Sequence, residues 1–271
     1  MSAQAREIAP AKLNLALHVR GRLADGRHAI ETIYAFCTDG DWLTGEPASE
    51  ISLRLTGPFA SDLDETQENL VTRAARALAK AAGVTAYGAA LTLDKRLPVA
   101  SGIGGGSADA AAALRLLTTM WSIDPNHAEA VAPALGSDVP ACLLSLPSRG
   151  VGAGDQLAPI AAFELSGTPV LLVNPRASLS TAEVFARLDG TDLGPLDDWR
   201  EGRNDLEAPA IALVPQIRSV LAWLGVQPGA NFVRMSGSGA TCFALFASED
   251  ARNAAADAVP REWWRLATFL R

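Results

Sequence analysis

The alternation of hydrophobic and polar residues predicts a series of short β-strands. In residues 12–19 apolar and polar positions alternate, which places Lys12, Asn14 and His18 on one face of a strand and leucines on the other. Further strands are predicted at 28–37, 51–56, 88–94, near 150 and 157, and at 169–173, 231–235 and 241–246.

Other stretches carry apolar residues at the spacing of an α-helix. Residues 69–82 form such a stretch, and Gly83 follows in the place of a C-cap. An alanine-rich helix is predicted from Ala108 to about Met120. Further helices are predicted at 127–135, 180–188, 207–224 and 249–258. Because strands and helices do not alternate regularly, the pattern does not favour a doubly wound parallel sheet.

The composition is that of a globular protein. Of the 271 residues, 49% are hydrophobic and 20% are charged, a balance without the signature of a disordered chain. The net charge of -7 does not favour a nucleic-acid-binding protein, which would carry a basic surface. An anionic substrate would therefore have to be held by individual cationic side chains and backbone amides.

The cysteines, the histidines and the beginning of the chain narrow the class further. The three cysteines are far apart and have apolar neighbours, which predicts buried thiols rather than disulfides or a zinc site. The three histidines lack metal-ligand spacing. The first residues do not resemble a signal peptide, and no run reaches the roughly 18 apolar residues of a membrane span. We therefore expect a soluble, cytoplasmic protein with no membrane and no nucleic acid as partner.

A glycine-rich segment directly before the alanine-rich helix is the most informative part of the chain. Residues 95–109 read KRLPVASGIGGGSAD, with four glycines in five positions. Without Cβ atoms the backbone can approach a ligand closely, and the helix that follows presents free N–H groups and the positive end of its dipole. Ser107 adds a hydroxyl that can donate to a phosphate oxygen or bind magnesium. The segment therefore predicts a phosphate-binding loop.

Two common phosphate loops do not match this segment. A Walker A loop needs a lysine after its last glycine, and none follows Gly106. A dinucleotide fingerprint needs a second strand that ends near an acidic residue, but Asp124 lies in a polar turn. A glycine-rich turn without a ligand stays open, although so many glycines before a helix are costly.

At this point the sequence resembles a known family, the GHMP kinases. Residues 98–108 are similar to their phosphate loop, and the triple glycine followed by Ser107 is similar to the branch that phosphorylates a cytidine-diphosphate-linked methylerythritol. Residues 9–15, 136–140 and 235–240 resemble further segments of the family in the same order, and residues 204–207 match one more landmark. The resemblance implies a two-domain α+β GHMP fold with the active site in the inter-domain cleft. It also suggests a nucleotide-binding domain at 1–158 and a substrate-side domain at 159–271, with a boundary in the seam around 150–165.

The resemblance implies a catalytic pair. Asp138, in Gly-Ser-Asp-Val-Pro, matches the catalytic base, and Lys12 matches a lysine expected beside it. From the residues alone, Lys12 and Asn14 also fit an exposed polar face of an edge strand. Asp138 alone also fits a helix cap or a turn.

The nucleotide side follows from the same resemblance. ATP is the expected phosphoryl donor and Mg²⁺ is expected with it; the metal ligands are not identified, with Ser107 and Asp109 as candidates. Asn69 and Lys95 match nucleotide-side positions, but they also fit a helix N-cap and a surface lysine. The loop residues expected to bind the nucleotide are Pro98, Val99, Ala100, Ser101, Gly102, Ile103, Gly104, Gly105, Gly106, Ser107 and Ala108.

The expected substrate is a small molecule that carries cytidine diphosphate. Residues 25–28 resemble the family's Asp-Gly-Tyr-His signature for cytidine, with Arg27 in place of the tyrosine and His28 retained. Phe185 matches the aromatic side chain on the other side of the base, although alone it fits a core position. Asn14, Thr181 and Gly237 complete the substrate-side residues that the resemblance implies.

The resemblance thus implies ATP-dependent phosphorylation of the 2-hydroxyl of 4-diphosphocytidyl-2-C-methyl-D-erythritol, a step in the synthesis of isoprenoid precursors without mevalonate. Another GHMP kinase, acting on mevalonate, homoserine or a sugar, would share the glycine loop. A nucleotide-binding module that has lost catalysis is a third possibility, against which the presence of Lys12 and Asp138 argues.

Overall fold

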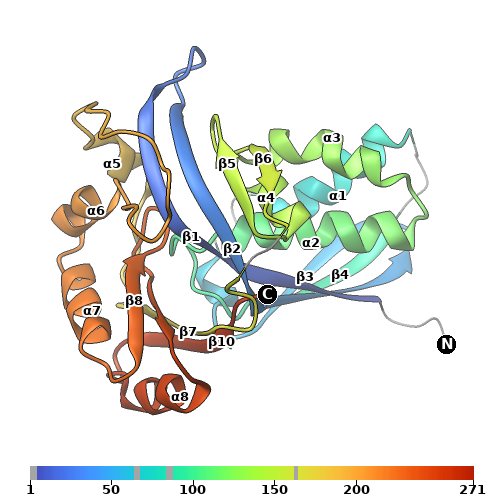
Figure 1. Cartoon of the computed structure of the whole chain (residues 1–271). Coiled ribbons are helices and arrows are strands. Elements are labelled where there is room, and N and C mark those ends of the chain that lie inside the picture. The colour runs from blue at the N-terminus through green and yellow to red at the C-terminus, as the bar shows by residue number, and fades with distance from the viewer. Residues whose placement is uncertain (1–4, 64–67, 84–87, 162–163) are drawn as a thin grey trace. The chain divides into compact units, whose positions relative to one another are not determined.

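The computed structural model describes residues 5–63, 68–83, 88–161 and 164–271, and these form two compact units. The first unit comprises Met1–Ala11, Asp39–Val99 and Gly104–Ser145, and the second comprises Lys12–Thr38, Ala100–Ile103 and Leu146–Arg271. The units interleave along the chain because β1 (Ala5–Arg22) and β2 (His28–Ala48) each contribute residues to both (Figure 1). The sequence suggests two continuous domains instead, and their boundary after residue 158 stays a prediction.

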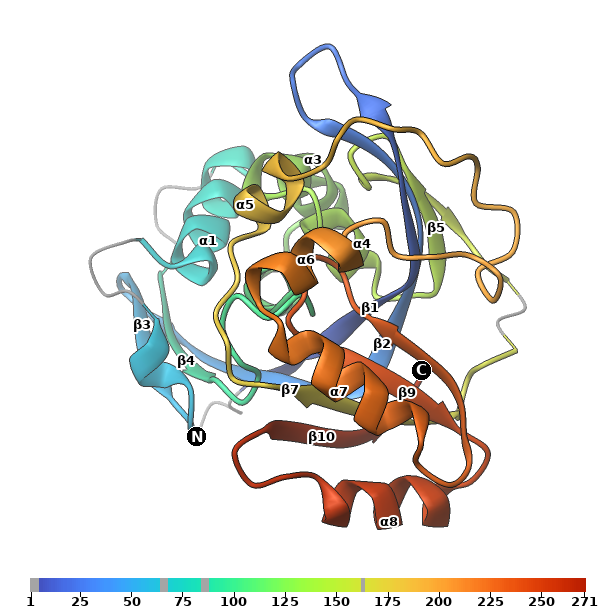
Figure 2. The ribbon, with the colours of Figure 1, turned by 90° about the vertical axis from the view of Figure 1, so that its left-hand side faces the viewer.

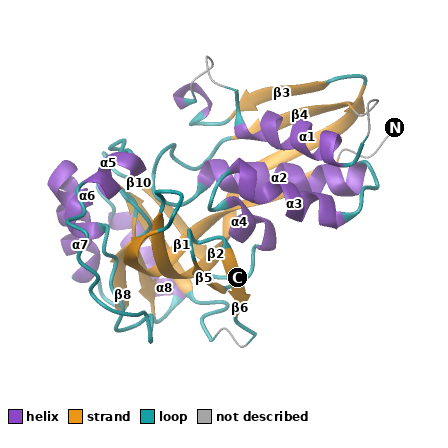
Figure 3. Cartoon of the chain, turned by 90° about the horizontal axis from the view of Figure 1, so that it is seen from above, coloured by secondary structure: helices purple, strands orange, loops and turns teal. Residues whose placement is uncertain are grey.

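The first unit places helices on one face of a small sheet (Figure 3). Strand β3 (Ile51–Thr56) pairs in parallel with β4 (Gly88–Asp94), and β4 pairs antiparallel with the end of β2. Helix α1 (Leu70–Ala81) packs against β3 and against α2 (Gly105–Met120), and small alanines on both helices allow the close approach. Helices α3 (Pro125–Leu135) and α4 (Val139–Leu144) and a 3-10 turn (Ala60–Asp62) complete this unit.

The second unit is built on an antiparallel sheet in the order β10-β7-β9-β8. Helix α7 lies over one face of this sheet in Figure 2, α6 packs against α7, and α8 also packs on the sheet. Chain order and pairing give the β-α-β-β-α-β motif. The elements are β7 (Pro169–Asn174), α6 (Glu207–Leu213), α7 (Gln216–Gly225), β8 (Ala230–Met235), β9 (Cys242–Phe246), α8 (Glu249–Ala258) and β10 (Trp264–Phe269).

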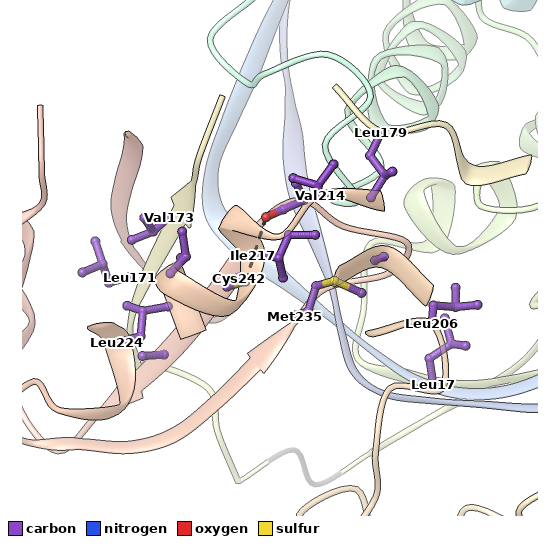
Figure 4. Close-up of a cluster of buried hydrophobic side chains, with 14 of the residues drawn as sticks. Leu17, Leu171, Val173, Leu179, Leu206, Val214, Ile217, Leu224, Met235 and Cys242 are labelled. Carbon is purple, nitrogen blue, oxygen red and sulfur yellow. Dashed lines mark hydrogen bonds between the residues drawn. The ribbon is translucent and has the colours of Figure 1, made fainter. Parts of the chain in front are cut away.

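Apolar side chains from the sheet and its helices make the core of the second unit (Figure 4). Leu171 and Val173 alternate along β7 and face the same way, toward Ile217 and Leu224 of α7. Strands β5 (Ser148–Val151) and β6 (Gln156–Pro159) form a hairpin that pairs with the beginning of β2, and the short helix α5 (Thr181–Ala186) follows β7.

The predicted elements are confirmed with one exception, and several differ at their ends. The strand predicted at 12–19 is the middle of the much longer β1, and α2 begins at Gly105 rather than at Ala108. The single helix predicted at 207–224 is wrong: it is divided into α6 and α7 at Pro215, whose ring lacks the N–H that a continuous helix needs. Helix α4 and strand β10 were not predicted from the pattern.

Two further expectations concern the cysteines and the membrane. All three cysteines are buried free thiols, as predicted. Within the ranges that the structure describes, the helices are too short or too polar to cross a membrane.

Replacing Gly40 by Ala should destabilise the protein by about 3 kcal/mol, because an added Cβ overpacks rigid backbone. A Cβ on Gly40 would lie 1.9 Å from the carbonyl oxygen of Ala9 and 2.7 Å from Cα of Pro10. Gly225 is the matched control, since a Cβ there would meet nothing within 4 Å. Gly225→Ala should raise the free energy of unfolding by about 0.5 kcal/mol. Urea unfolding measures both, and equal stabilities of the two variants would contradict the packing.

Candidate active site

The polar face of β1 is buried and linked by hydrogen bonds. The ammonium of Lys12 donates to Oδ1 of Asn14 at 2.8 Å, and Nδ2 of Asn14 donates to the hydroxyl of Thr32 at 2.8 Å. Lys12 is 3% exposed and Asn14 is 2% exposed, so the alternative of an exposed polar face is wrong. Polar side chains remain buried in this way only when hydrogen bonds satisfy them.

The β8–β9 turn meets the glycine segment within the second unit. The hydroxyl of Ser236 accepts the N–H of Asn14 at 3.2 Å and donates to the carbonyl of Gly102 at 3.0 Å. The backbone N–H of Lys12 donates to the carbonyl of Ile103 at 3.0 Å. Three segments that are far apart in the sequence, near residues 12, 102 and 236, are therefore tied together.

Glycine is required on both sides of this contact. A Cβ on Gly102 would lie 2.5 Å from the carbonyl oxygen of Ser236, and a Cβ on Gly237 would lie 2.7 Å from that of Gly102. Both residues also have positive φ, 77° at Gly102 and 54° at Gly237. The contact brings Gly102, Asn14 and Gly237, predicted as site residues from separate motifs, to one place.

The side chain of Asn204 forms hydrogen bonds with the backbone of the β8–β9 turn. Its Nδ2 donates to the carbonyls of Met235 and Gly237, each at 2.8 Å, and its Oδ1 accepts the N–H of Leu206 at 3.0 Å. The sequence marked residues 204–207 as a family landmark without giving them a role. The structure shows that Asn204 holds the backbone of the turn.

In the first unit, Lys95 lies buried beside the first turn of α2. Its Nζ donates to Asp41 at 2.5 Å and to Asp109 at 2.6 Å, and it lies 3.1 Å from where a Cβ on Gly105 would stand. Lys95 is 1% exposed, so the alternative of a surface lysine is wrong. The predicted nucleotide contact of Lys95 stays a prediction.

The two carboxylates of this cluster have different surroundings. Oδ1 of Asp41 accepts the N–H groups of Arg96 at 2.5 Å and of Leu97 at 2.8 Å, at the entry to the glycine segment. Oδ1 of Asp109 is buried and has no hydrogen-bond partner among the described residues. Burial raises the pKa of Asp109 to about 7; the attraction of Lys95 opposes this and the charge of Asp41 adds to it. Asp109 therefore keeps its proton up to about pH 7.

The first turn of α2 also adjoins the Gly-Ser-Asp segment. A Cβ on Gly136 would lie 4.0 Å from the hydroxyl of Ser107. Asp138 occupies the N-cap position of α4, but its side chain makes no capping hydrogen bond, so side-chain capping does not account for an aspartate there. Gly104 precedes α2 with a φ of 66°, and the first N–H groups of the helix have no acceptor within it.

Candidate metal ligands are sparse. Oδ2 of Asp109 is taken by Lys95 and its other oxygen is buried, so this carboxylate does not fit a metal beside the loop. Ser107 is half-buried, and its hydroxyl oxygen is of a type that binds Mg²⁺. In the part of the chain that the structure describes, no group of three or more histidines, cysteines or acidic residues is placed to hold a metal ion.

Aromatic rings from β2 and α5 meet in the second unit. His28 and Phe185 stack with their ring centroids 4.7 Å apart and their planes at 26°. The hydroxyl groups of Thr181 and Ser238 lie 2.8 Å apart. Burial, with the charge of Arg22, lowers the pKa of His28, so the imidazole is neutral at pH 7 and offers one donor and one acceptor. The resemblance implies that His28 and Phe185 lie on either side of a base; the structure brings the two rings next to each other, and their contact with a base stays a prediction.

A cavity of about 740 Å³ lies beside His28. Charged and polar residues line part of it: Arg22, Arg187, Asp189, Thr191 and Asp205. Asp205 lies in the landmark at 204–207, whereas no motif in the sequence signalled the other four, which come from segments without a recognisable spacing.

Two other predicted residues have local roles in the structure. Oδ1 of Asn69 accepts the N–H of Val71 at 2.8 Å, so the helix-cap alternative is confirmed and the nucleotide contact stays a prediction. Arg27 is half exposed and donates from Nε to the carboxylate of Asp25 at 2.8 Å. This ion pair holds the tip of the loop between β1 and β2.

Comparison with known proteins agrees with these motifs. The family model of the GHMP kinases N terminal domain matches residues 69–145, and that of the GHMP kinases C terminal domain matches residues 182–266. The 4-diphosphocytidyl-2-C-methyl-D-erythritol kinase of Rhizorhabdus wittichii is 54% identical, over 98% of this chain and 94% of the relative. The enzyme of the same name from Novosphingobium aromaticivorans is 50% identical, over 98% and 93%.

The chain belongs to the 4-diphosphocytidyl-2-C-methyl-D-erythritol kinase family of the GHMP kinases.

Solved structures support the fold of this kinase family. A crystal structure of 4-(cytidine 5'-diphospho)-2C-methyl-D-erythritol kinase matches with a TM-score of 0.83 and 32% identity, and 98% of each chain is covered. A homoserine kinase from Cytophaga hutchinsonii matches with a TM-score of 0.72 at 15% identity, over 100% of this chain and 96% of the other, which shows the shared fold alone. The resemblance to the GHMP kinases and the α+β fold class are thus confirmed.

In this member of the kinase family, Asp109→Asn should remove a pH dependence of stability. The folded protein holds the Asp109 proton up to about pH 7, whereas the unfolded chain releases it near the ordinary pKa of 3.8. Below about pH 4 this proton therefore makes its full contribution to the free energy of unfolding, about 4 kcal/mol at most. The contribution is lost as the pH rises to about 7.

Urea unfolding between about pH 5 and pH 8 measures this dependence. The variant should lack the fall in the free energy of unfolding that the unmodified protein shows as the pH rises. Glu129→Gln, at an exposed position of α3, is the control and should keep the fall. Parallel curves for the unmodified protein and Asp109→Asn would exclude Asp109 as the titrating group.

Proposed function

We propose that this protein transfers the γ-phosphoryl group of ATP to the 2-hydroxyl of 4-diphosphocytidyl-2-C-methyl-D-erythritol. The relatives of that name, at 54% and 50% identity over nearly the whole chain, support the substrate. The observation that carries the catalytic part is the hydrogen-bonded contact of Lys12, Asn14, Gly102 and Ser236 in the second unit. A buried lysine on a fixed strand beside a glycine segment suits the stabilisation of a phosphoryl group.

The glycine loop binds the phosphates of ATP through its backbone. The N–H groups of the first turn of α2 have no acceptor inside the helix, and the helix dipole favours negative charge at that end. Gly105 and Gly106 leave these N–H groups without side chains in front of them. The hydroxyl of Ser107 would be a ligand of Mg²⁺ bound with ATP, and the ion would neutralise phosphate charge.

Asp138 and Lys12 serve the transfer itself. The carboxylate of Asp138 accepts the proton of the 2-hydroxyl while the hydroxyl oxygen forms a bond to the γ-phosphorus, and the bond between that phosphorus and ADP breaks. The ammonium of Lys12 offsets charge on the transferring group.

His28 and Phe185 bind the cytosine ring. Their centroids are 4.7 Å apart, whereas a ring inserted between them needs about 7 Å, twice the usual contact distance. The two rings therefore separate when the base enters between them. Thr181, Asn14 and Gly237 contact the remainder of the substrate, and Arg27 takes the place of an aromatic ring while Asp25 holds it.

Asp138→Asn should reduce turnover by about 10³-fold, because the variant keeps the shape of the side chain but cannot accept the proton. ADP release is measured with Mg-ATP and 4-diphosphocytidyl-2-C-methyl-D-erythritol, and mevalonate serves as the control substrate. Turnover of mevalonate and not of the cytidine compound would contradict the substrate. Full activity of Asp138→Asn would contradict the base.

Phe185→Ala should raise KM for the cytidine substrate by about tenfold, because a stacked base loses one of its two aromatic neighbours. The value of kcat should change little, since stacking is equally strong before and during transfer. KM for ATP is the internal control and should stay the same. A rise confined to KM for ATP would place Phe185 on the nucleotide side.

A further inference from the structure

Thr32 lies on β2 directly behind the polar face of β1, and it is fully buried. Its hydroxyl donates to the carbonyl of Ala16 at 2.6 Å and accepts Nδ2 of Asn14 at 2.8 Å. Oδ1 of Asn14 in turn accepts the ammonium of Lys12 at 2.8 Å. No motif in the sequence pointed to Thr32, and its hydroxyl is two hydrogen bonds away from Lys12.

In this series of hydrogen bonds, the groups at the two ends decide which atom donates and which accepts in every bond. A backbone carbonyl only accepts, so the proton of the Thr32 hydroxyl points to Ala16 and a lone pair faces Asn14. The Asn14 amide must then turn its NH₂ group toward Thr32 and its oxygen toward Lys12. An ammonium only donates, so it requires an oxygen there. The amide orientation is thereby fixed by chemistry as well as by shape.

From these contacts we propose that Thr32 is a positioning residue, which fixes the Asn14 amide and through it the ammonium of Lys12. The inference rests on the proposed function in one respect, the catalytic role of Lys12. Without the Thr32 hydroxyl, Nδ2 of Asn14 loses its acceptor, and the amide keeps only its bond to the ammonium of Lys12. An amide held at one end only is free to turn about that bond, and the ammonium, on a long side chain with many rotamers, would shift with it.

Two further contacts of Lys12 do not direct its N–H bonds in this way. The ring of Tyr34 lies with its centroid 5.4 Å from the ammonium, and a ring face attracts a cation without fixing the direction of its N–H bonds. The bond from the backbone N–H of Lys12 to the carbonyl of Ile103 holds the strand and does not direct the side chain. The amide of Asn14 supplies a directional acceptor instead.

Thr32→Val tests the proposal, because valine keeps the branched shape and removes the hydroxyl. We expect kcat to fall by about 30-fold with KM for ATP unchanged, the range of a misplaced catalytic group. Thr32→Ser should recover kcat to within about threefold of the unmodified enzyme, since the hydroxyl returns. Thr38→Val on the same strand removes a hydroxyl bonded to Thr268 and is the matched control, with kcat unchanged.

A double-mutant cycle separates positioning from a general loss of structure. If Thr32 acts through Asn14, Thr32→Val should have no further effect on kcat in the Asn14→Ala background. If the two substitutions lower kcat independently, so that their fold-changes multiply in the double variant, the proposal is overturned. An unchanged kcat in Thr32→Val would also overturn it.

The side-chain amide signal of Asn14 in ¹⁵N NMR gives a readout that does not need turnover. The signal is assigned by its loss in Asn14→Ala. It should shift in Thr32→Val and keep its position in Thr32→Ser, and an equal signal in all three proteins would overturn the proposal. If the unmodified protein does not phosphorylate the cytidine substrate, the proposed function fails, while the NMR comparison still decides whether Thr32 orients Asn14.

Discussion

The first unit is organised around the ammonium of Lys95, which has almost no contact with water. Removing such a charge from water costs several kcal/mol unless opposite charges meet it at close range. Asp41 comes from β2 and Asp109 from α2, so if either element moved away, the buried ammonium would lose one of its two acceptors. The N–H groups of Arg96 and Leu97 bind the same Asp41 carboxylate, which fixes the backbone that leads into the glycine segment. One buried ion cluster thus gives a fixed position to the helix end proposed to hold phosphate.

The corresponding contacts in the second unit are made by backbone atoms rather than by buried charges. Asn204 and Ser236 hold carbonyls and N–H groups, and the close contact of Gly102 with Gly237 excludes any side chain between them. Such a contact tolerates substitution poorly, because the atoms that would collide are backbone atoms. This explains in physical terms why glycine stands at these positions.

Local patterns in the sequence predicted most elements, while contacts between distant residues were out of their reach. Alternation at 12–19 predicted β1 but not that its polar face is buried, because burial depends on β2 and the β8–β9 turn. Lys95 matched a nucleotide-side motif, yet its partners lie 54 and 14 residues away in the sequence. Pro215 was a visible signal for the break between α6 and α7. Thr32 carries no signal of its own, since its role depends on the polarity of its neighbours.

The interleaving of the two units has a consequence for synthesis of the chain. Every residue of the first unit lies within the first 145, so this unit can fold once the segment up to Ser145 has left the ribosome. The second unit needs residues from Lys12 onward together with β10, and the N–H of Arg271 still donates to the carbonyl of Phe36. The four-stranded sheet of the second unit is therefore complete only when its last strand, β10, has been made. Until then the edge of β7 that pairs with β10 lacks its neighbour, and residues 100–103 of the glycine segment belong to a unit that is still unfinished.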